Sequence, residues 1–139
     1  MTPVMVAGAG QIGRLIACLL ADTKDYQVYL ADCDLSAADT QILLKKMPVI
    51  QPIVLDMTDK KALKKALKTH QITALISSLP YFLNPLLAEA AKATATHYFD
   101  LTEDIAVAAK IKALAVDAKT IFVSQCGMAP GFVSMVAHS

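Results

Sequence analysis

The sequence predicts an α/β fold built on a parallel sheet, and three observations lead to this prediction. An apolar run at residues 4–7 leads directly into the pattern Gly-x-Gly-x-x-Gly, at Gly8, Gly10 and Gly13. Short β-favouring runs then alternate with helical patterns, and polar or glycine-rich loops follow the predicted strands. Parallel strands joined by helices need right-handed crossovers, which place helices on both faces of the sheet. We therefore expect a doubly wound Rossmann fold whose six strands lie in the order 3-2-1-4-5-6.

The composition indicates one domain spanning residues 1–139. Apolar residues make up 55% of the chain and charged residues 18%, which is typical of a domain with a buried core. A formal net charge of +1 provides no field that would attract nucleic acid or an anionic membrane. Cys18, Cys33 and Cys126 lie far apart, which indicates a reducing compartment, the cytoplasm. We predict neither a secretory leader nor a membrane span, because Gly8 interrupts the first apolar run.

The glycine pattern predicts a phosphate-binding turn between a strand and a helix. Gly8 suits the tight turn, Gly10 lets the backbone approach a pyrophosphate, and Gly13 lets the helix pack closely on the strand. The charge of the ligand would then lie against the amide groups at the N-terminus of the helix. The apolar residues expected to pack this helix on the sheet are Ile12, Leu15, Ile16, Leu19 and Leu20.

A second β-favouring run, at residues 28–31, ends at Asp32. This acid lies nineteen residues after Gly13, where dinucleotide-binding folds place a carboxylate. The carboxylate would accept hydrogen bonds from a ribose hydroxyl and would repel a 2′-phosphate, and no arginine follows it nearby in the sequence. We therefore predict NAD as the cofactor rather than NADP. The alternative is that Asp32 only caps the following turn.

The next part of the chain predicts a peripheral strand between two helices. A helix beginning at Asp34 or Ser36 runs to about residue 46, and Pro52 places the strand at 49–55 near a sheet edge. Thr58 or Asp59 caps the following helix, which carries five lysines on its outer face. No aromatic residues interleave with these lysines, which favours a solvated helix face over a nucleic-acid site. The lysines are Lys60, Lys61, Lys64, Lys65 and Lys68.

The last part of the chain adds three predicted strands, at residues 72–76, 97–99 and 121–124. The first of these is nearly continuously apolar, as expected of a central strand buried on both faces. Asn84 followed by proline begins a helix that runs through residue 93, and Thr102 caps the last helix. The three histidines pair at no metal-ligand spacing, so we predict no metal site.

With these loops in view, the chain resembles the nucleotide-binding domain of the saccharopine dehydrogenase-like family, which includes saccharopine and lysine 6-dehydrogenases. The resemblance implies that a hydride passes between a nicotinamide cofactor and the carbon of an amine or imine in an amino-acid-derived substrate. The Cys126 segment looks closest to lysine 6-dehydrogenase-like members. The matching segments are Gly-Ala-Gly-Gln-Ile-Gly at 8–13, the acid Asp32, Ile-Ser-Ser-Leu-Pro-Tyr at 76–81, His-Tyr-Phe-Asp at 97–100 and Cys-Gly-Met-Ala-Pro-Gly at 126–131.

The resemblance also implies roles for individual residues, but it assigns no proton-transfer residue. Structural alternatives stay open for Asp56 as a helix-start acid, for Asp100 as a turn former and for Tyr81 as a packing residue. The implied pyrophosphate site comprises Gly8, Gly10, Gln11, Ile12 and Gly13. The implied adenosine site comprises Asp32, Asp56 and Met57, and the nicotinamide ribose lies over Ser77, Ser78, Leu79 and Pro80. The implied substrate side comprises Tyr81, Asp100 and Cys126.

In the family, the segment at 126–131 leads into a substrate and dimerisation domain, whereas this sequence stops at Ser139. We therefore expect the cofactor-binding fragment of a longer, homodimeric enzyme, with little turnover of its own. A rival interpretation is a non-catalytic regulatory domain that senses NAD or ATP, since such domains share the fold, the glycines and the acid. The loops at 77–81 and 126–131 favour the dehydrogenase, because a sensor has no need of a nicotinamide pocket.

Overall fold

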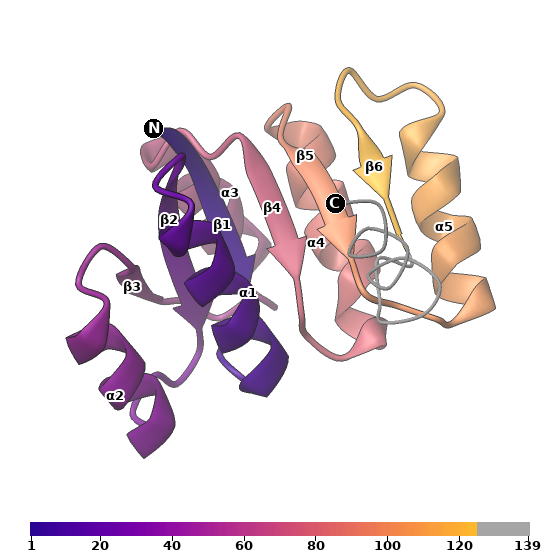
Figure 1. Cartoon of the computed structure of the whole chain (residues 1–139). Helices are drawn as coiled ribbons and strands as arrows, with labels where there is room; N and C mark the ends of the chain where they lie inside the picture. The colour runs from indigo at the N-terminus through magenta and orange to yellow at the C-terminus, as the bar shows by residue number, and fades with distance from the viewer. Residues whose placement is uncertain (125–139) are drawn as a thin grey trace.

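Figure 1 shows the computed structural model of the chain, in which residues 1–124 are described. Six strands form a single sheet, and helices pack on both of its faces. The strands are β1 (Thr2–Ala7), β2 (Tyr26–Asp32), β3 (Gln51–Val54), β4 (Ala74–Ser77), β5 (His97–Asp100) and β6 (Phe122–Val123). The helices are α1 (Gln11–Asp22), α2 (Ala38–Lys46), α3 (Lys60–Thr69), the short 3₁₀ helix η1 (Tyr81–Leu83), α4 (Asn84–Ala93) and α5 (Ile105–Ala115).

The sheet has the predicted topology. Its strand order is β3-β2-β1-β4-β5-β6, and every strand pair is parallel. β1 lies between β2 and β4, and β3 and β6 form the two edges (Figure 1). The predicted doubly wound Rossmann fold is therefore confirmed. This order brings the carboxyl ends of β1, β2 and β4 together, which is the place where such sheets bind ligands.

Each face of the sheet has its own hydrophobic core, because successive side chains of a strand point to opposite faces. On one face, Val4 and Val6 of β1 pack with Ala17 and Ala21 of α1. On the other, Met5 packs in a larger cluster that includes buried residues of α3, α4 and α5. None of the helices within residues 1–124 has the length and apolar character needed to cross a bilayer.

The predicted packing stripe of α1 is partly wrong. Ile12, Leu15 and Leu19 are 44–48% exposed, and the buried residues of this helix are Gly13, Ala17 and Ala21. Ile16 and Leu20 are only partly buried. The reason is steric, because the close approach that Gly13 makes to the strand turns the face with the smallest side chains toward the sheet.

The edges and helix ends follow local chemistry. Among the described strands β3 pairs with β2 alone, so Pro52 lies in an edge strand as predicted. Asp59 caps α3 by accepting a hydrogen bond from the Ala62 amide at 3.1 Å. α5 is capped by Asp104 rather than by the predicted Thr102, whose hydroxyl instead accepts a hydrogen bond from the Asp104 amide. Leu63 and Leu67 are the buried side of α3, and four of its five lysines are exposed.

Buried polar groups connect the ends of β4 and β5 with the start of α4. The Ser77 hydroxyl donates to Asn84 Oδ1 at 2.6 Å, and both residues are 1% exposed. Tyr98 donates its phenolic hydrogen to Asp100 Oδ2 at 2.8 Å, and the Thr102 amide donates to Asp100 Oδ1 at 3.0 Å. Because buried polar groups must be hydrogen-bonded, these contacts hold the loops after β4 and β5 in one arrangement.

We expect Ser77→Ala to lower the free energy of unfolding by about 1–3 kcal/mol, since the buried Asn84 oxygen loses its donor. The matched control is Ser36→Ala, at an exposed serine, for which we expect a change within about 0.5 kcal/mol. Urea denaturation of both variants measures the difference. Equal losses from the two substitutions would contradict the structural role given to this network.

Candidate functional site: the carboxyl ends of β1, β2 and β4

The glycine loop between β1 and α1 forms a tight turn with one open position. Gly8 has φ = +104°, a conformation that side chains disfavour, and its amide donates to the Ala31 carbonyl at 2.8 Å. Among residues 1–124, no atom lies within 4 Å of the position that a Cβ on Gly10 would occupy. Within this described part of the chain no side chain caps the N-terminus of α1 at Gly10, so the first amide groups of the helix are available to an anionic ligand.

Gly13 packs against the turn itself. A Cβ on Gly13 would lie 1.8 Å from the Gly8 carbonyl oxygen and 2.6 Å from Ser78 Oγ, so only glycine is accommodated there. The Ser78 hydroxyl lies 3.0 Å from the Ala7 carbonyl oxygen and 3.1 Å from that of Gly8. The loop after β4 therefore supports the glycine loop directly, a contact between residues seventy positions apart.

Ala9 connects the glycine loop with the end of β2 and with α2. Its amide donates to Asp32 Oδ2 at 2.7 Å, and the Cys33 amide donates to Asp32 Oδ1 at the same distance. Its carbonyl accepts a hydrogen bond from Arg14 Nη1 at 2.8 Å and a longer one, at 3.5 Å, from the buried Thr40 hydroxyl. Asp32 thus binds the amide of Ala9, and Arg14 binds its carbonyl.

Asp56 follows β3 and forms a local turn. Its Oδ1 accepts hydrogen bonds from the Thr58 hydroxyl at 2.6 Å and from the Thr58 amide at 2.9 Å. These two bonds hold the pKa of the Asp56 carboxyl below its ordinary value. Met57 is 5% exposed and belongs to the core cluster on the α3 side, although the backbone keeps this loop beside β2 because the Leu55 amide donates to the Asp32 carbonyl.

The loop after β4 runs from a buried to an exposed end. The Leu79 amide donates to Ser77 Oγ at 3.3 Å. The Leu79 side chain lies beside Gly8, 3.1 Å from the position that a Cβ on Gly8 would occupy. Pro80 is exposed, and Tyr81 is 53% exposed in η1, where its ring meets Phe82 edge to face. Of the predicted nicotinamide-side residues, Ser78 and Leu79 thus lie against the glycine loop, Ser77 is anchored in the core, and Tyr81 lies at the surface.

The other two residues expected on the substrate side differ from Tyr81. Asp100 is 0% exposed, and both of its carboxylate oxygens accept hydrogen bonds. Cys126 lies outside the described residues. Among residues 1–124, no three histidine, cysteine, aspartate or glutamate side chains gather as a metal-binding group.

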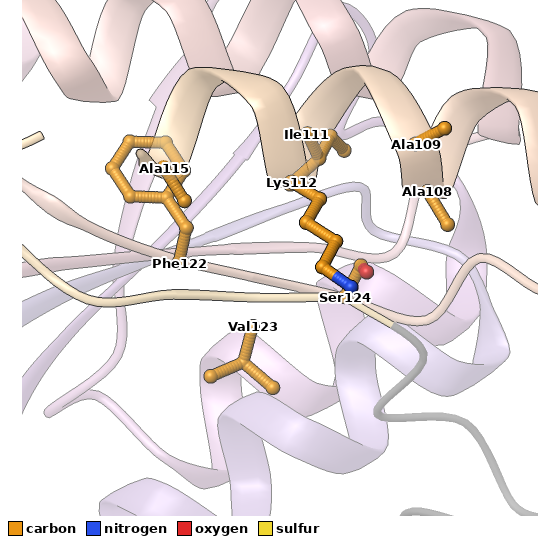
Figure 2. A pocket seen from close by; sticks show the side chains of 8 residues that line it. All are labelled: Ala108, Ala109, Ile111, Lys112, Ala115, Phe122, Val123 and Ser124. Carbon is orange, nitrogen blue, oxygen red and sulfur yellow. The ribbon is translucent and has the colours of Figure 1, made fainter. Parts of the chain in front are cut away.

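A cavity of about 420 Å³ lies between α5 and β6 (Figure 2). β4 and β5 separate it from β1, so it is not the site at the glycine loop. In Figure 2 the side chain of Lys112 extends along the cavity toward Ser124, where the described part of the chain ends. Its lining residues are Ala108, Ala109, Ile111, Lys112, Ala115, Phe122, Val123 and Ser124.

Comparison with known proteins identifies relatives of this arrangement. A family model described as "Saccharopine dehydrogenase NADP binding domain" matches residues 4–123. Saccharopine dehydrogenase (NADP(+), L-glutamate-forming) of Schizosaccharomyces pombe is 26% identical over 137 residues, which are 99% of this chain and 30% of the yeast protein. The chain therefore spans about a third of the length of this relative.

Solved structures agree with this result. Apo saccharopine dehydrogenase (L-Glu forming) from Saccharomyces cerevisiae superimposes with a TM-score of 0.81 at 26% identity, covering 99% of this chain and 30% of the yeast chain. A UDP-glucuronic acid 4-epimerase from Bacillus cereus in complex with NAD reaches a TM-score of 0.69 at 14% identity, covering 88% and 55% of the two chains. The second likeness shows the fold alone.

These comparisons contradict the predicted preference for NAD over NADP. The matched family is described by NADP binding, and the name of the S. pombe relative specifies NADP(+). The prediction weighed only the residues next to Asp32 in sequence. The fold adds Arg14, which reaches Ala9 from α1, and it engages both oxygens of Asp32 with main-chain amides.

Sequence reasoning missed two residues of this region. Arg14 places a cation in the first turn of α1, where the helix dipole disfavours it, and that misplaced charge was the available signal. Asn84 was interpreted only as a helix start, whereas its side chain accepts the hydrogen bond from Ser77. The partner of Asn84 lies on another element, so no local pattern could indicate it.

We expect Gly13→Ala to cost about 3 kcal/mol or more of unfolding free energy, because its Cβ would overlap the Gly8 carbonyl. The control is Gly10→Ala, which meets open space at φ = −72° and should cost less than about 1 kcal/mol. Chemical denaturation compares them. A Gly13→Ala protein as stable as Gly10→Ala would contradict the close packing.

Proposed function

The chain belongs to the saccharopine dehydrogenase NADP binding domain family, and on this premise we propose that it binds NADP across the carboxyl ends of β1, β2 and β4. The observation that carries the proposal is the interlocked contact of Gly8, Gly13 and Ser78, which leaves Gly10 open beside the uncapped start of α1. Such a turn supplies amide groups and a helix dipole to a pyrophosphate.

The proposed site assigns one part of the dinucleotide to each strand end. Gly10 and the helix-start amides of Gln11 and Ile12 hold the pyrophosphate beside Gly8 and Gly13. Asp32, already oriented by two amides, faces the adenosine ribose, with Asp56 and Met57 toward the adenine. The loop comprising Ser77, Ser78, Leu79 and Pro80 lies under the nicotinamide ribose. When bound, NADP supplies hydride-transfer chemistry, and this chain holds and orients it.

We further propose that the whole protein is an oxidoreductase acting on the CH–NH or CH–NH₂ group of an amino-acid substrate of the saccharopine or lysine type. The names of the two yeast relatives support this class of reaction. This chain covers 30% of the length of each of those relatives, so the activity of a whole enzyme is proposed from their names and not from this chain alone. Tyr81, Asp100 and Cys126 are the proposed substrate-side residues, of which Asp100 is buried at the end of β5. We also propose that the whole protein is cytoplasmic, forms a homodimer and takes part in lysine metabolism.

Calorimetric titration of the chain with NADP tests the proposed cofactor site. We expect saturable one-site binding and a rise in thermal stability, amounting to about 2.7 kcal/mol when free NADP is a hundredfold above its dissociation constant. Gly10→Val is the matched control, because its Cβ meets no atom of the described residues within 4 Å while its side chain blocks the approach of a pyrophosphate. Binding of ATP without binding of NADP would contradict the proposal and favour a regulatory domain.

A second test concerns turnover. We expect the 139-residue chain, given NADP⁺ with saccharopine or with lysine, to form NADPH at no more than a small fraction of the rate of a whole saccharopine dehydrogenase. The physical reason is that turnover needs a positioned and desolvated substrate, and this chain covers only 30% of the length of the yeast enzymes. NADPH absorbance follows the reaction. Turnover by the chain alone at the rate of a whole enzyme would show that the substrate site lies within these residues.

A further inference from the structure

The charged side chains around Ala9 indicate how the protein recognises the adenosine end of the cofactor. Arg14 stands in the first turn of α1, near the positive end of the helix dipole, so its position is electrostatically unfavourable unless an anion compensates it. Its side chain is only 21% exposed and is held by the hydrogen bond from Nη1 to the Ala9 carbonyl at 2.8 Å. This hydrogen bond and the partial burial of the side chain fix the position of the guanidinium group.

Most of the hydrogen-bonding capacity of Arg14 remains unused within the described residues. A guanidinium has five N–H donors, and one of them serves Ala9. The nearest carboxylate is that of Asp39 at the start of α2, 3.7 Å from Nη2 and 77% exposed. An ion pair of this length and exposure contributes little. Asp39 is thus a weak competitor that a stronger anion displaces.

Two acids lie at or just after the end of β2, and each accepts hydrogen bonds from groups already present in the fold. Asp32 accepts from the amides of Ala9 and Cys33, and Asp34 accepts from the hydroxyl and amide of Ser36. The Asp32 carboxylate raises the pKa of the Cys33 thiol, which therefore stays neutral. With Asp39 these acids make the end of β2 and the start of α2 negatively charged, and Arg14 is the one arginine of the sequence that can offset them for a phosphate.

We propose that Arg14 recognises the 2′-phosphate of NADP and is the residue that determines the choice between NADP and NAD. This inference rests on the proposed NADP site. An arginine fork matches a phosphate with two parallel charge-assisted hydrogen bonds, which an exposed carboxylate at 3.7 Å cannot equal.

The test compares ligands that differ only in the 2′-phosphate, namely NADP with NAD and 2′,5′-ADP with 5′-AMP. For Arg14→Gln we expect the affinity for NADP and 2′,5′-ADP to fall roughly tenfold to a hundredfold, with the affinity for NAD and 5′-AMP within about twofold of wild type. Arg14→Lys should retain part of the discrimination, because it keeps the charge without the fork. Calorimetry measures all four ligands, and circular dichroism confirms folding.

Asp39→Asn provides an independent measurement that leaves Arg14 in place. Removal of the competing carboxylate should tighten NADP binding and leave NAD binding unchanged. If Arg14→Gln weakens NADP and NAD equally, Arg14 only holds the Ala9 carbonyl and the inference is overturned, while the proposed NADP site stands. If wild-type protein binds neither nucleotide, the proposed function fails and the inference fails with it.

Discussion

The fit of Gly13 against the Gly8 carbonyl is the contact on which the site depends. A Cβ on Gly13 would lie only 1.8 Å from that oxygen, so the start of α1 packs directly against the turn that follows β1. Two consequences follow from this closeness. The small face of α1, at Gly13, Ala17 and Ala21, turns to the sheet, and the N-terminus of the helix adjoins the glycine loop, where we propose that the pyrophosphate binds.

The loop after β4 stabilises this turn from the neighbouring strand. Ser78 bonds the carbonyls of Ala7 and Gly8, and Ser77 is anchored to Asn84 in the core. The same interior holds Tyr98 and Asp100, so the end of β5 belongs to the same polar arrangement. Nucleotide loops on this sheet are therefore not independent surface segments, and a rigid buried network sets the distance between them.

The prediction of NAD rather than NADP applied a valid local rule, and the comparisons nevertheless contradict it. An acid at the end of β2 repels a 2′-phosphate only to the extent that its charge is uncompensated. Here two amides bind Asp32, and a guanidinium from α1 contacts the same alanine that donates to it. The electrostatic balance belongs to a cluster assembled from β1, α1, β2 and α2, whereas the sequence argument considered one residue and its neighbours along the chain.

Local sequence determined the sheet order, the edge position of Pro52 and the place of the glycine turn, because hydrophobic period, proline and glycine act within a few residues. It also located Ser77 and Ser78 at a strand end. Tertiary structure alone decided that Ile12, Leu15 and Leu19 stay half exposed, that Asp100 is buried and that Arg14 meets Ala9. Those outcomes depend on how closely elements approach and on charges brought together from distant positions, neither of which a linear pattern contains.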